Sequence, residues 1–202
     1  MKYRKKVNVV VEGNLDERVV RRLFKEYDFE VNKVYGKEGK RTILGKMSNY
    51  NQASLKTSVP WIVLVDLDRD EKCAPPFVKK HLKKPSPNIF FRVAVREIEA
   101  WLMADREKIA HFIGVSENLV PIRVEEEMDP KKTIISLVDS SSKIGIKEDI
   151  LPRPGSRASE GKLYNSRMIE FADKFWRPEI AAKNSDSLRR FIKTINKIAQ
   201  GS

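Results

Sequence analysis

The stretch WIVLVDLDRDE, residues 61–71, joins an apolar run to three acidic residues at alternating positions. Residues 61–68 are rich in β-branched and aromatic side chains and are predicted to form a buried strand. Asp66 and Asp68 close this strand, where two neighbouring carboxylates repel each other unless a cation lies between them. We therefore expect a metal ion at these two aspartates, whereas Asp70 is interpreted as an acid of a solvated loop.

Strand-like and helix-like patterns alternate on both sides of this stretch. The predicted strands are residues 6–13, 29–35, 61–68 and 88–95, and the predicted helices are residues 14–27, 41–56, 74–82, 96–113, 129–141, 165–176 and 185–199. This alternation predicts an α/β fold with a mainly parallel, Rossmann-like sheet flanked by helices. We expect a core of residues 1–113 and a mostly helical, basic C-terminal extension, residues 114–202, packed on it as one structural unit.

The charge balance points to a polyanionic partner. The 202 residues include 40 Lys and Arg against 28 Asp and Glu, a net charge of +12. Nucleic acid is the commonest polyanion for such a surface, and a basic surface without this role is the alternative. The single cysteine excludes an internal disulfide, and only two histidines argue against a multi-histidine zinc site. No apolar run approaches the ~20 residues of a membrane span, so we expect no membrane contact and a cytoplasmic location.

Further carboxylates lie at the carboxyl ends of the predicted strands, where parallel sheets bind their ligands. Glu12 closes the first predicted strand, and Glu97 and Glu99 follow the fourth. Asp16, one turn into the first predicted helix, can face the same crevice. Together with the two aspartates at the end of the third strand, these hard oxygen ligands suit Mg²⁺ or Mn²⁺, which also accept phosphate oxygens.

Each of these acids also has a purely structural interpretation. Glu12 can be a residue of a strand-end turn, and Asp16 can be an acid favoured by the helix dipole, a role we prefer for it over direct ligation. Glu97 and Glu99 are two residues apart on a predicted helix, so they cannot both face one ion. We prefer Glu97 slightly, and the choice between the two stays open.

Basic residues near these acids are predicted to hold the phosphate backbone. The segment LPRPGSRASEGK, residues 151–162, is a basic loop rich in Pro, Gly and Ser. The predicted nucleic-acid contacts are Arg92, Arg96, Arg153, Arg157 and Lys162. By contrast, GKEGK, residues 36–40, lacks the spacing of a P-loop and is interpreted as a turn with basic tips.

Two motifs resemble the TOPRIM domain, the metal-binding module shared by type IA topoisomerases, primases and OLD-type nucleases. They are VVVEGNLDERVV, residues 9–20, and VLVDLD, residues 63–68. OLD-type members add an acid in the first helix, matched by Asp16, and a later glutamate, which Glu97 or Glu99 could match. Residues 92–105 and 175–191 carry a closer resemblance, to a family of small stand-alone TOPRIM-like proteins of unknown function that are often found with phage-defence ATPases.

The resemblance implies a TOPRIM-like fold and Mg²⁺-dependent phosphodiester chemistry. One or two ions would be held mainly by four residues, Glu12, Asp66, Asp68 and Glu97 or Glu99. Our leading hypothesis is a metal-dependent nuclease acting in phage defence, with Glu12, Asp66, Asp68 and Glu97 as its catalytic residues. We see no ATPase domain, so energy coupling would need an ATPase partner, and we find no room for the extra parts of a topoisomerase or primase.

Two other hypotheses remain. One is a non-catalytic module that uses a metal ion to bind nucleic acid or an ATPase. The other is a haloacid-dehalogenase-like phosphatase with Asp66 as nucleophile, ranked last because two strands precede its DxD motif and Glu12 would be unexplained. A homodimer is left open.

Overall fold

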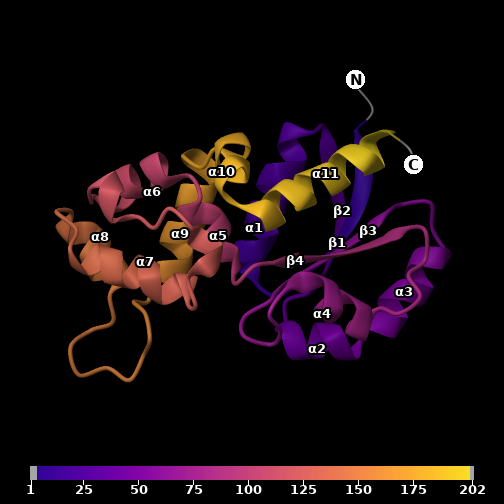
Figure 1. The fold of residues 1–202 in the computed structure, drawn as a ribbon, viewed down its shortest axis with the longest axis horizontal. Helices are drawn as coiled ribbons and strands as arrows, with labels where there is room; N and C mark the ends of the chain where they lie inside the picture. Colours follow the sequence, from indigo (N-terminus) through magenta and orange to yellow (C-terminus); the bar gives the residue numbers. More distant parts are fainter. Residues whose placement is uncertain (1–3, 201–202) are drawn as a thin grey trace.

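The sheet has four parallel strands. A computed structural model describes residues 4–200, which form the strands β1 (Lys5–Val11), β2 (Phe29–Gly36), β3 (Trp61–Asp66) and β4 (Ile89–Ala94). Their order is β2-β1-β3-β4, so β2 and β4 are the edge strands (Figure 1). The predicted α/β fold, with a parallel sheet flanked by helices and a mostly helical C-terminal extension, is confirmed.

Helices follow each strand and make up most of the second half of the chain. They are α1 (Asn14–Glu26), α2 (Lys40–Gly45), α3 (Met47–Leu55), α4 (Ala74–His81), α5 (Ile98–Met103), α6 (Arg106–Ile113), α7 (Pro130–Asp139), α8 (Ile144–Ile150), α9 (Tyr164–Lys174), α10 (Pro178–Asn184) and α11 (Asp186–Gln200), with short 3-10 turns at Glu117–Leu119 and Val124–Glu126. Within residues 4–200, none of these helices has the length and apolarity needed to cross a membrane.

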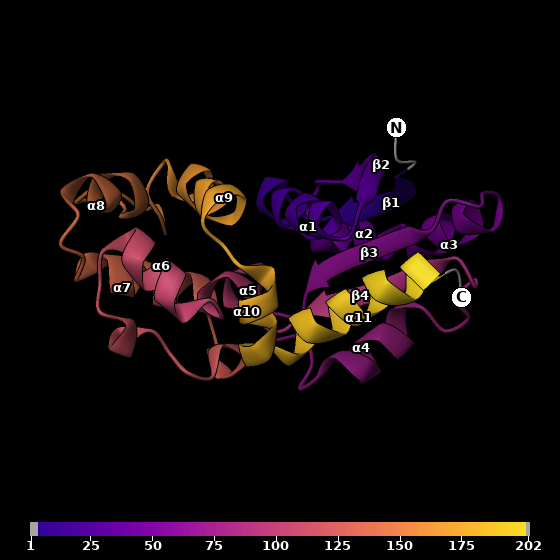
Figure 2. The ribbon, with the colours of Figure 1, turned by 90° about the horizontal axis from the view of Figure 1, so that it is seen from above.

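Both faces of the sheet are covered, which explains why its strands are apolar runs rather than alternating patterns. On one face, side chains such as Val9 and Leu64 pack with residues of α1 and α11. On the other face, side chains such as Val63 and Phe91 pack with residues of α2, α3 and α4. The carboxyl ends of the strands remain uncovered by these two layers and face the helical part of the molecule (Figure 2).

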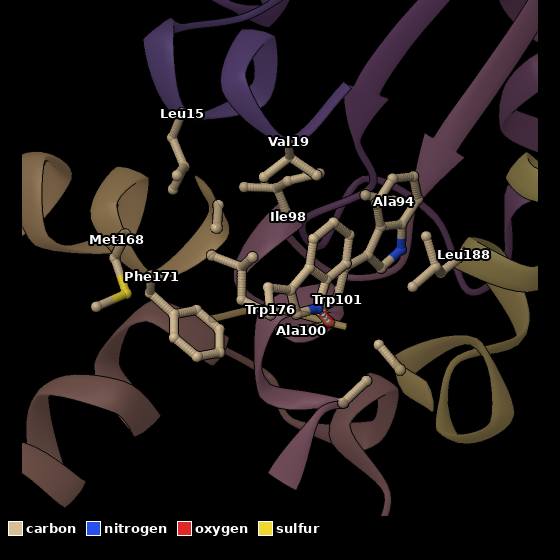
Figure 3. Close-up of a cluster of buried hydrophobic side chains, with 14 of the residues drawn as sticks. Leu15, Val19, Ala94, Ile98, Ala100, Trp101, Met168, Phe171, Trp176 and Leu188 are labelled. Atoms are coloured by element: carbon tan, nitrogen blue, oxygen red, sulfur yellow. Dashed lines mark hydrogen bonds between the residues drawn. The ribbon is translucent and has the colours of Figure 1, made fainter. Parts of the chain in front are cut away.

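The first of these clusters continues from the sheet into the helical part. Trp101 of α5, Phe171 of α9 and Trp176 after α9 are buried within it (Figure 3). The indole N–H of Trp176 donates to the carbonyl oxygen of Trp101 at 3.1 Å. One continuous core therefore joins residues of the predicted 1–113 core to residues of the extension.

Several predicted boundaries are wrong. The helix predicted over residues 96–113 begins at Ile98 and is broken between α5 and α6, where Asp105 is fully buried. The helix predicted over residues 41–56 is likewise two helices that meet at Lys46. Local periodicity does not reveal these breaks, because tertiary contacts set them. The strand predicted to reach Asp68 ends at Asp66, and Asp68 itself takes a positive φ of 49°.

Candidate metal centre

Four acidic residues line one cavity at the carboxyl edge of the sheet. Glu12 follows β1, Asp66 ends β3, and Asp16 and Glu99 lie in the first turns of α1 and α5. They line a cavity of about 400 Å³ together with Lys131 of α7. Parallel strands end at one edge, so residues more than 80 positions apart in the chain meet there.

Two carboxylate oxygens in this group have no hydrogen-bond partner. They are Oδ1 of Asp16 and Oδ1 of Asp66, both buried among the residues that the structure describes. The Asp16 residue is only 6% exposed. Buried polar atoms in proteins are nearly always hydrogen-bonded, so each unpaired carboxylate oxygen requires an explanation.

Burial dominates the electrostatics of the cavity. It raises the pKa of Glu12 to about 7 and the pKa of Glu99 to about 7. Burial also raises the pKa of Asp16, and it raises the pKa of Asp66 well above its ordinary value, with neighbouring carboxylates adding to the effect. Like charges in a desolvated site disfavour ionisation, and a bound cation would reverse this.

Hydrogen bonds hold two of these carboxylates in place. The backbone N–H of Asp66 donates to Oε1 of Glu12 at 2.7 Å, which ties the end of β1 to the end of β3. The Tyr164 hydroxyl of α9 donates to Oε1 of Glu99 at 3.3 Å. The sheet edge and the helical part of the molecule therefore both position the cavity.

The other half of the DxD motif lies beside a lysine. Lys40 forms ion pairs with the carboxylates of Asp68 and, at 2.6 Å, Asp70. Its ammonium group also donates to the backbone oxygen of Asp66 at 3.3 Å. Asp70, interpreted from the sequence as a solvated loop acid, is thus paired, although its side chain is 47% exposed. Sequence reasoning missed Lys40 as a partner of the motif.

The GKEGK turn places Lys40 at this edge. Lys37 N–H donates to the Val11 carbonyl at 2.8 Å, and Gly39 N–H donates to the Glu12 carbonyl at 3.3 Å, so the turn folds over the end of β1. Gly36 has a φ of +86°, and a Cβ there would lie 2.4 Å from the Val11 oxygen. Only glycine fits this position. The sequence could have indicated Lys40 as a partner of the motif, because β2 ends at the same edge of the sheet as β1 and β3.

Glu97 and Glu99 occupy different surroundings. Glu99 lines the cavity, whereas Oε2 of Glu97 accepts the backbone N–H of Lys131 at 2.9 Å, in the first turn of α7. Glu97 precedes α5 rather than lying within it. Lys131 also pairs with Glu160 at 2.8 Å and lies 4.8 Å from the ring centre of Tyr164. Of the two glutamates left open by the sequence, Glu99 is the one inside the cavity.

The predicted nucleic-acid contacts are scattered. Arg96 donates to the backbone oxygens of Asp68 at 2.9 Å and Glu71 at 3.4 Å, so it braces the loop that carries the DxD motif. Arg92 lies between β4 and α11, away from the acidic cavity. The remaining three, Arg153, Arg157 and Lys162, are exposed on the loop between α8 and α9, which extends from the body of the molecule (Figure 1).

The carboxylates of the cavity suit a cation held by one or two protein ligands, and they do not form a complete set of protein ligands. Within residues 4–200, no group of three or more His, Cys, Asp or Glu side chains is arranged so as to hold a metal ion. A complete protein cage is therefore not present. Mg²⁺, however, usually takes one or two carboxylates and fills its other positions with water and phosphate oxygens. The unpaired oxygens of Asp16 and Asp66 fit that mode.

Comparisons with protein-family models, with curated proteins and with solved structures returned no match. The likeness to the TOPRIM domain therefore rests on the sequence motifs alone. The chemistry of the cavity has to be inferred from the side chains that line it.

Proposed function

We propose that this protein is a divalent-cation-dependent hydrolase that cleaves phosphodiester bonds in nucleic acid. The observation that carries the proposal is the pair of buried, unpaired carboxylate oxygens on Asp16 and Asp66, in a cavity that also holds Glu12 and Glu99. Such oxygens suit Mg²⁺ or Mn²⁺. The net charge of +12 favours a polyanionic substrate.

The residues of the cavity have distinct roles in this proposal. Asp16 and Asp66 would hold the cation, with Glu99 beside them. The cation would polarise the phosphoryl oxygen and lower the pKa of a water molecule. Glu12 Oε1 is held by the Asp66 N–H, which leaves Oε2 to take a proton from the attacking water.

Lys131 supplies positive charge on the other side of the cavity. Its ammonium group, between Glu160 and the Tyr164 ring, is placed to stabilise negative charge on the phosphate in the transition state. Water attacks phosphorus as Glu12 takes its proton, and the bond from phosphorus to the leaving oxygen breaks. The leaving oxygen takes up a proton from solvent, and Glu12 then releases its own proton to solvent.

The likeness of the motifs to the TOPRIM domain supports this reaction class. A role in phage defence, an ATPase partner and a cytoplasmic location are parts of the proposal that follow from the resemblance and the composition. They are independent of the geometry of the cavity.

Incubation of the purified protein with labelled DNA and RNA, single-stranded and duplex, tests the proposal. We expect cleavage of at least one substrate with Mg²⁺ or Mn²⁺ and none in EDTA. Asp66→Asn should lower the rate at least about 100-fold, since a catalytic cation contributes several kcal/mol and about 1.4 kcal/mol is tenfold. Asp139→Asn, at an exposed acid that ends α7, is the matched control. Absence of cation-dependent cleavage, or an unaffected Asp66→Asn variant, would overturn the proposal.

A non-catalytic module is the second candidate function. The observation that favours it is that Lys40 already neutralises Asp68 and Asp70, so this part of the DxD motif has a built-in cation. Its signature is salt-sensitive binding of nucleic acid or of an ATPase that depends on Mg²⁺ and gives no turnover.

A further inference from the structure

A groove lined by residues of the edge strand β4, of α4 and of α11 lies along that strand. Figures 1 and 2 show where these three elements lie. We call it the β4 groove. Its volume is about 740 Å³, within the range of ligand-binding pockets. Its apolar lining comes from β4 and the residue after it and from α4 and the residue after it: Phe91, Val93, Val95, Ala74, Pro75, Val78 and Leu82.

A second, smaller depression adjoins this groove and shares Arg92 and Arg190 with it. Its volume is about 260 Å³, and its lining is Arg92, Arg190, Lys193, Thr194 and Lys197. We call it the basic furrow. Four of its five lining residues are basic and none is acidic, so its charge favours an anion.

Arg92 is the most informative residue of the furrow. It is half-buried, and its Nε donates at 2.6 Å to the hydroxyl of Thr194, an uncharged acceptor. Within residues 4–200 it forms no ion pair. Burial lowers the pKa of Arg92, and the nearby charge of Arg190 lowers it further. A desolvated guanidinium beside another cation is unfavourable unless an anion joins them, and phosphate matches its fork of donors.

The acids that line the β4 groove are already engaged. Glu125 Oε1 accepts hydrogen bonds from Ser185 and Ser187, and Asp186 pairs with Arg189 and Arg190. On the α4 side of the groove, Lys72 and Lys79 are exposed. The groove and furrow together hold six basic residues against two acids, so their field attracts a polyanion.

We propose that the β4 groove and the basic furrow bind single-stranded nucleic acid, with a phosphate in the furrow and an unpaired base against the apolar lining. A duplex hides the faces of its bases, whereas a single strand can offer one to the lining. The choice of nucleic acid as the polyanion rests on the proposed function. The loop after β3 carries Asp68 and reaches the groove at Lys72 and Cys73.

Fluorescence anisotropy with labelled single-stranded DNA, single-stranded RNA and duplex DNA tests this inference. The measurements are made in EDTA, so that no cleavage occurs, and over a series of NaCl concentrations. The test variant is Lys193→Gln/Lys197→Gln, because both lysines are exposed on α11 and their loss does not threaten folding. The matched control is Lys25→Gln/Lys56→Gln, which removes the same charge from exposed positions on α1 and after α3.

We expect the furrow variant to bind a single strand at least about tenfold more weakly than the control variant at low salt. Its plot of log affinity against log salt should be flatter by about 0.7, since the furrow is proposed to hold one phosphate and each phosphate contact to a single strand contributes about 0.7. Arg92→Gln should have the same direction of effect, and Arg92→Lys should restore part of the affinity. Equal binding by the furrow and control variants would overturn the inference.

The apolar lining is tested separately with Val78→Glu, on the α4 wall. This change should weaken binding of the single strand more than binding of the duplex, because the duplex does not insert a base. Wild-type protein that binds duplex and single strand equally would contradict the proposal, as would capture of an acidic peptide without any oligonucleotide binding.

The outcomes for this inference and for the proposed function are distinguishable. Cleavage that is lost in Asp66→Asn, with oligonucleotide binding unaffected by the furrow variant, would leave the proposed function and remove the inference. Oligonucleotide binding that depends on the furrow, without any cleavage, would support the inference and overturn the proposed hydrolase activity.

Discussion

The fold treats two aspartates differently: Asp105, which is fully buried, and Asp66, which is half-buried but has a buried carboxylate oxygen. Asp105, after α5, is fully buried and accepts hydrogen bonds from the backbone N–H, Nε and a terminal nitrogen of Arg177, at 2.9, 3.0 and 2.7 Å. Asp66, in the cavity that the start of α5 helps to line, has a buried oxygen without any donor and several carboxylates as neighbours.

The difference shows that this chain can neutralise a buried acid where the acid is structural. Arg177 satisfies Asp105 and joins the residue between α5 and α6 to the start of α10. Within residues 4–200, no arginine does the same for Asp66 at the acidic cavity. A buried charge without a partner is unfavourable, and such exceptions gather at functional sites. We therefore read the first aspartate as structural and the second as a ligand-binding residue.

The largest expected effect is the loss of cleavage activity on substitution of Asp66. Asp66→Asn should abolish cation-dependent cleavage, with a loss of at least about 100-fold, while its free energy of unfolding in EDTA stays the same or increases, because a repulsive charge is removed. Gel assays and denaturant titrations measure both quantities. An Asp66→Asn protein that is less stable and fully active would invert our interpretation.

Asp105→Ala should lower the stability of the protein and leave its cleavage activity unchanged. We expect a loss of about 2–3 kcal/mol in the free energy of unfolding, at the low end for a broken buried pair because Arg177 can turn toward solvent. Cleavage per folded molecule should be unchanged. Chemical denaturation checks the stability, and Arg177→Gln provides the matched variant from the other side of the pair.

The pH dependence of stability tests the buried carboxyls of the cavity. Glu99 has an ordinary pKa of 4.5 and a folded-state pKa of about 7, so between these values the folded protein holds a proton that the unfolded chain has released. Stability in EDTA should therefore fall as pH rises through this window, by about 3 kcal/mol, since one pKa unit corresponds to about 1.4 kcal/mol.

Two controls sharpen this measurement. Glu99→Gln should remove part of the decline, and saturating Mg²⁺ should flatten it by favouring the ionised carboxylates. A wild-type profile in EDTA that is level across the window would show that the cavity does not carry the protons we assign to it.

The smallest effect is expected at Lys40. Lys40→Gln should lower stability by about 1 kcal/mol or less, because its partners Asp68 and Asp70 are 44% and 47% exposed. It should also raise the affinity for Mn²⁺ a few-fold, because both carboxylates are released. Isothermal titration calorimetry measures this change, and Lys46→Gln, at an exposed lysine paired with Glu38, is the control.

The sequence was sufficient for the parallel sheet and for the residues at its carboxyl edge. Apolar runs and their closing acids are local signals, and the rule that parallel strands end at one edge does the rest. This is why Glu12 and Asp66, 54 positions apart, could be placed together before the hydrogen bond between them was seen.

What the sequence could not supply depends on long-range contacts. The break between α5 and α6 exists because Asp105 bonds to Arg177, 72 positions later. Glu99 rather than Glu97 lines the cavity because α7 presents the Lys131 N–H to Glu97. Arg92 was grouped with the acidic site, but its neighbours come from α11, an element whose position on the sheet no local pattern reveals.

The placement of α11 has a consequence for how the chain acquires its structure. This helix supplies Leu188, Phe191 and Ile195 to the core over the sheet, and Thr194 contacts Arg92 across 102 positions. During synthesis, β4 leaves the ribosome long before the helix that covers it. The nascent chain must therefore keep an apolar strand face shielded for that interval, and contacts so distant in sequence slow folding. The same helix forms one wall of the β4 groove, so the groove forms only after α11 has packed on the sheet.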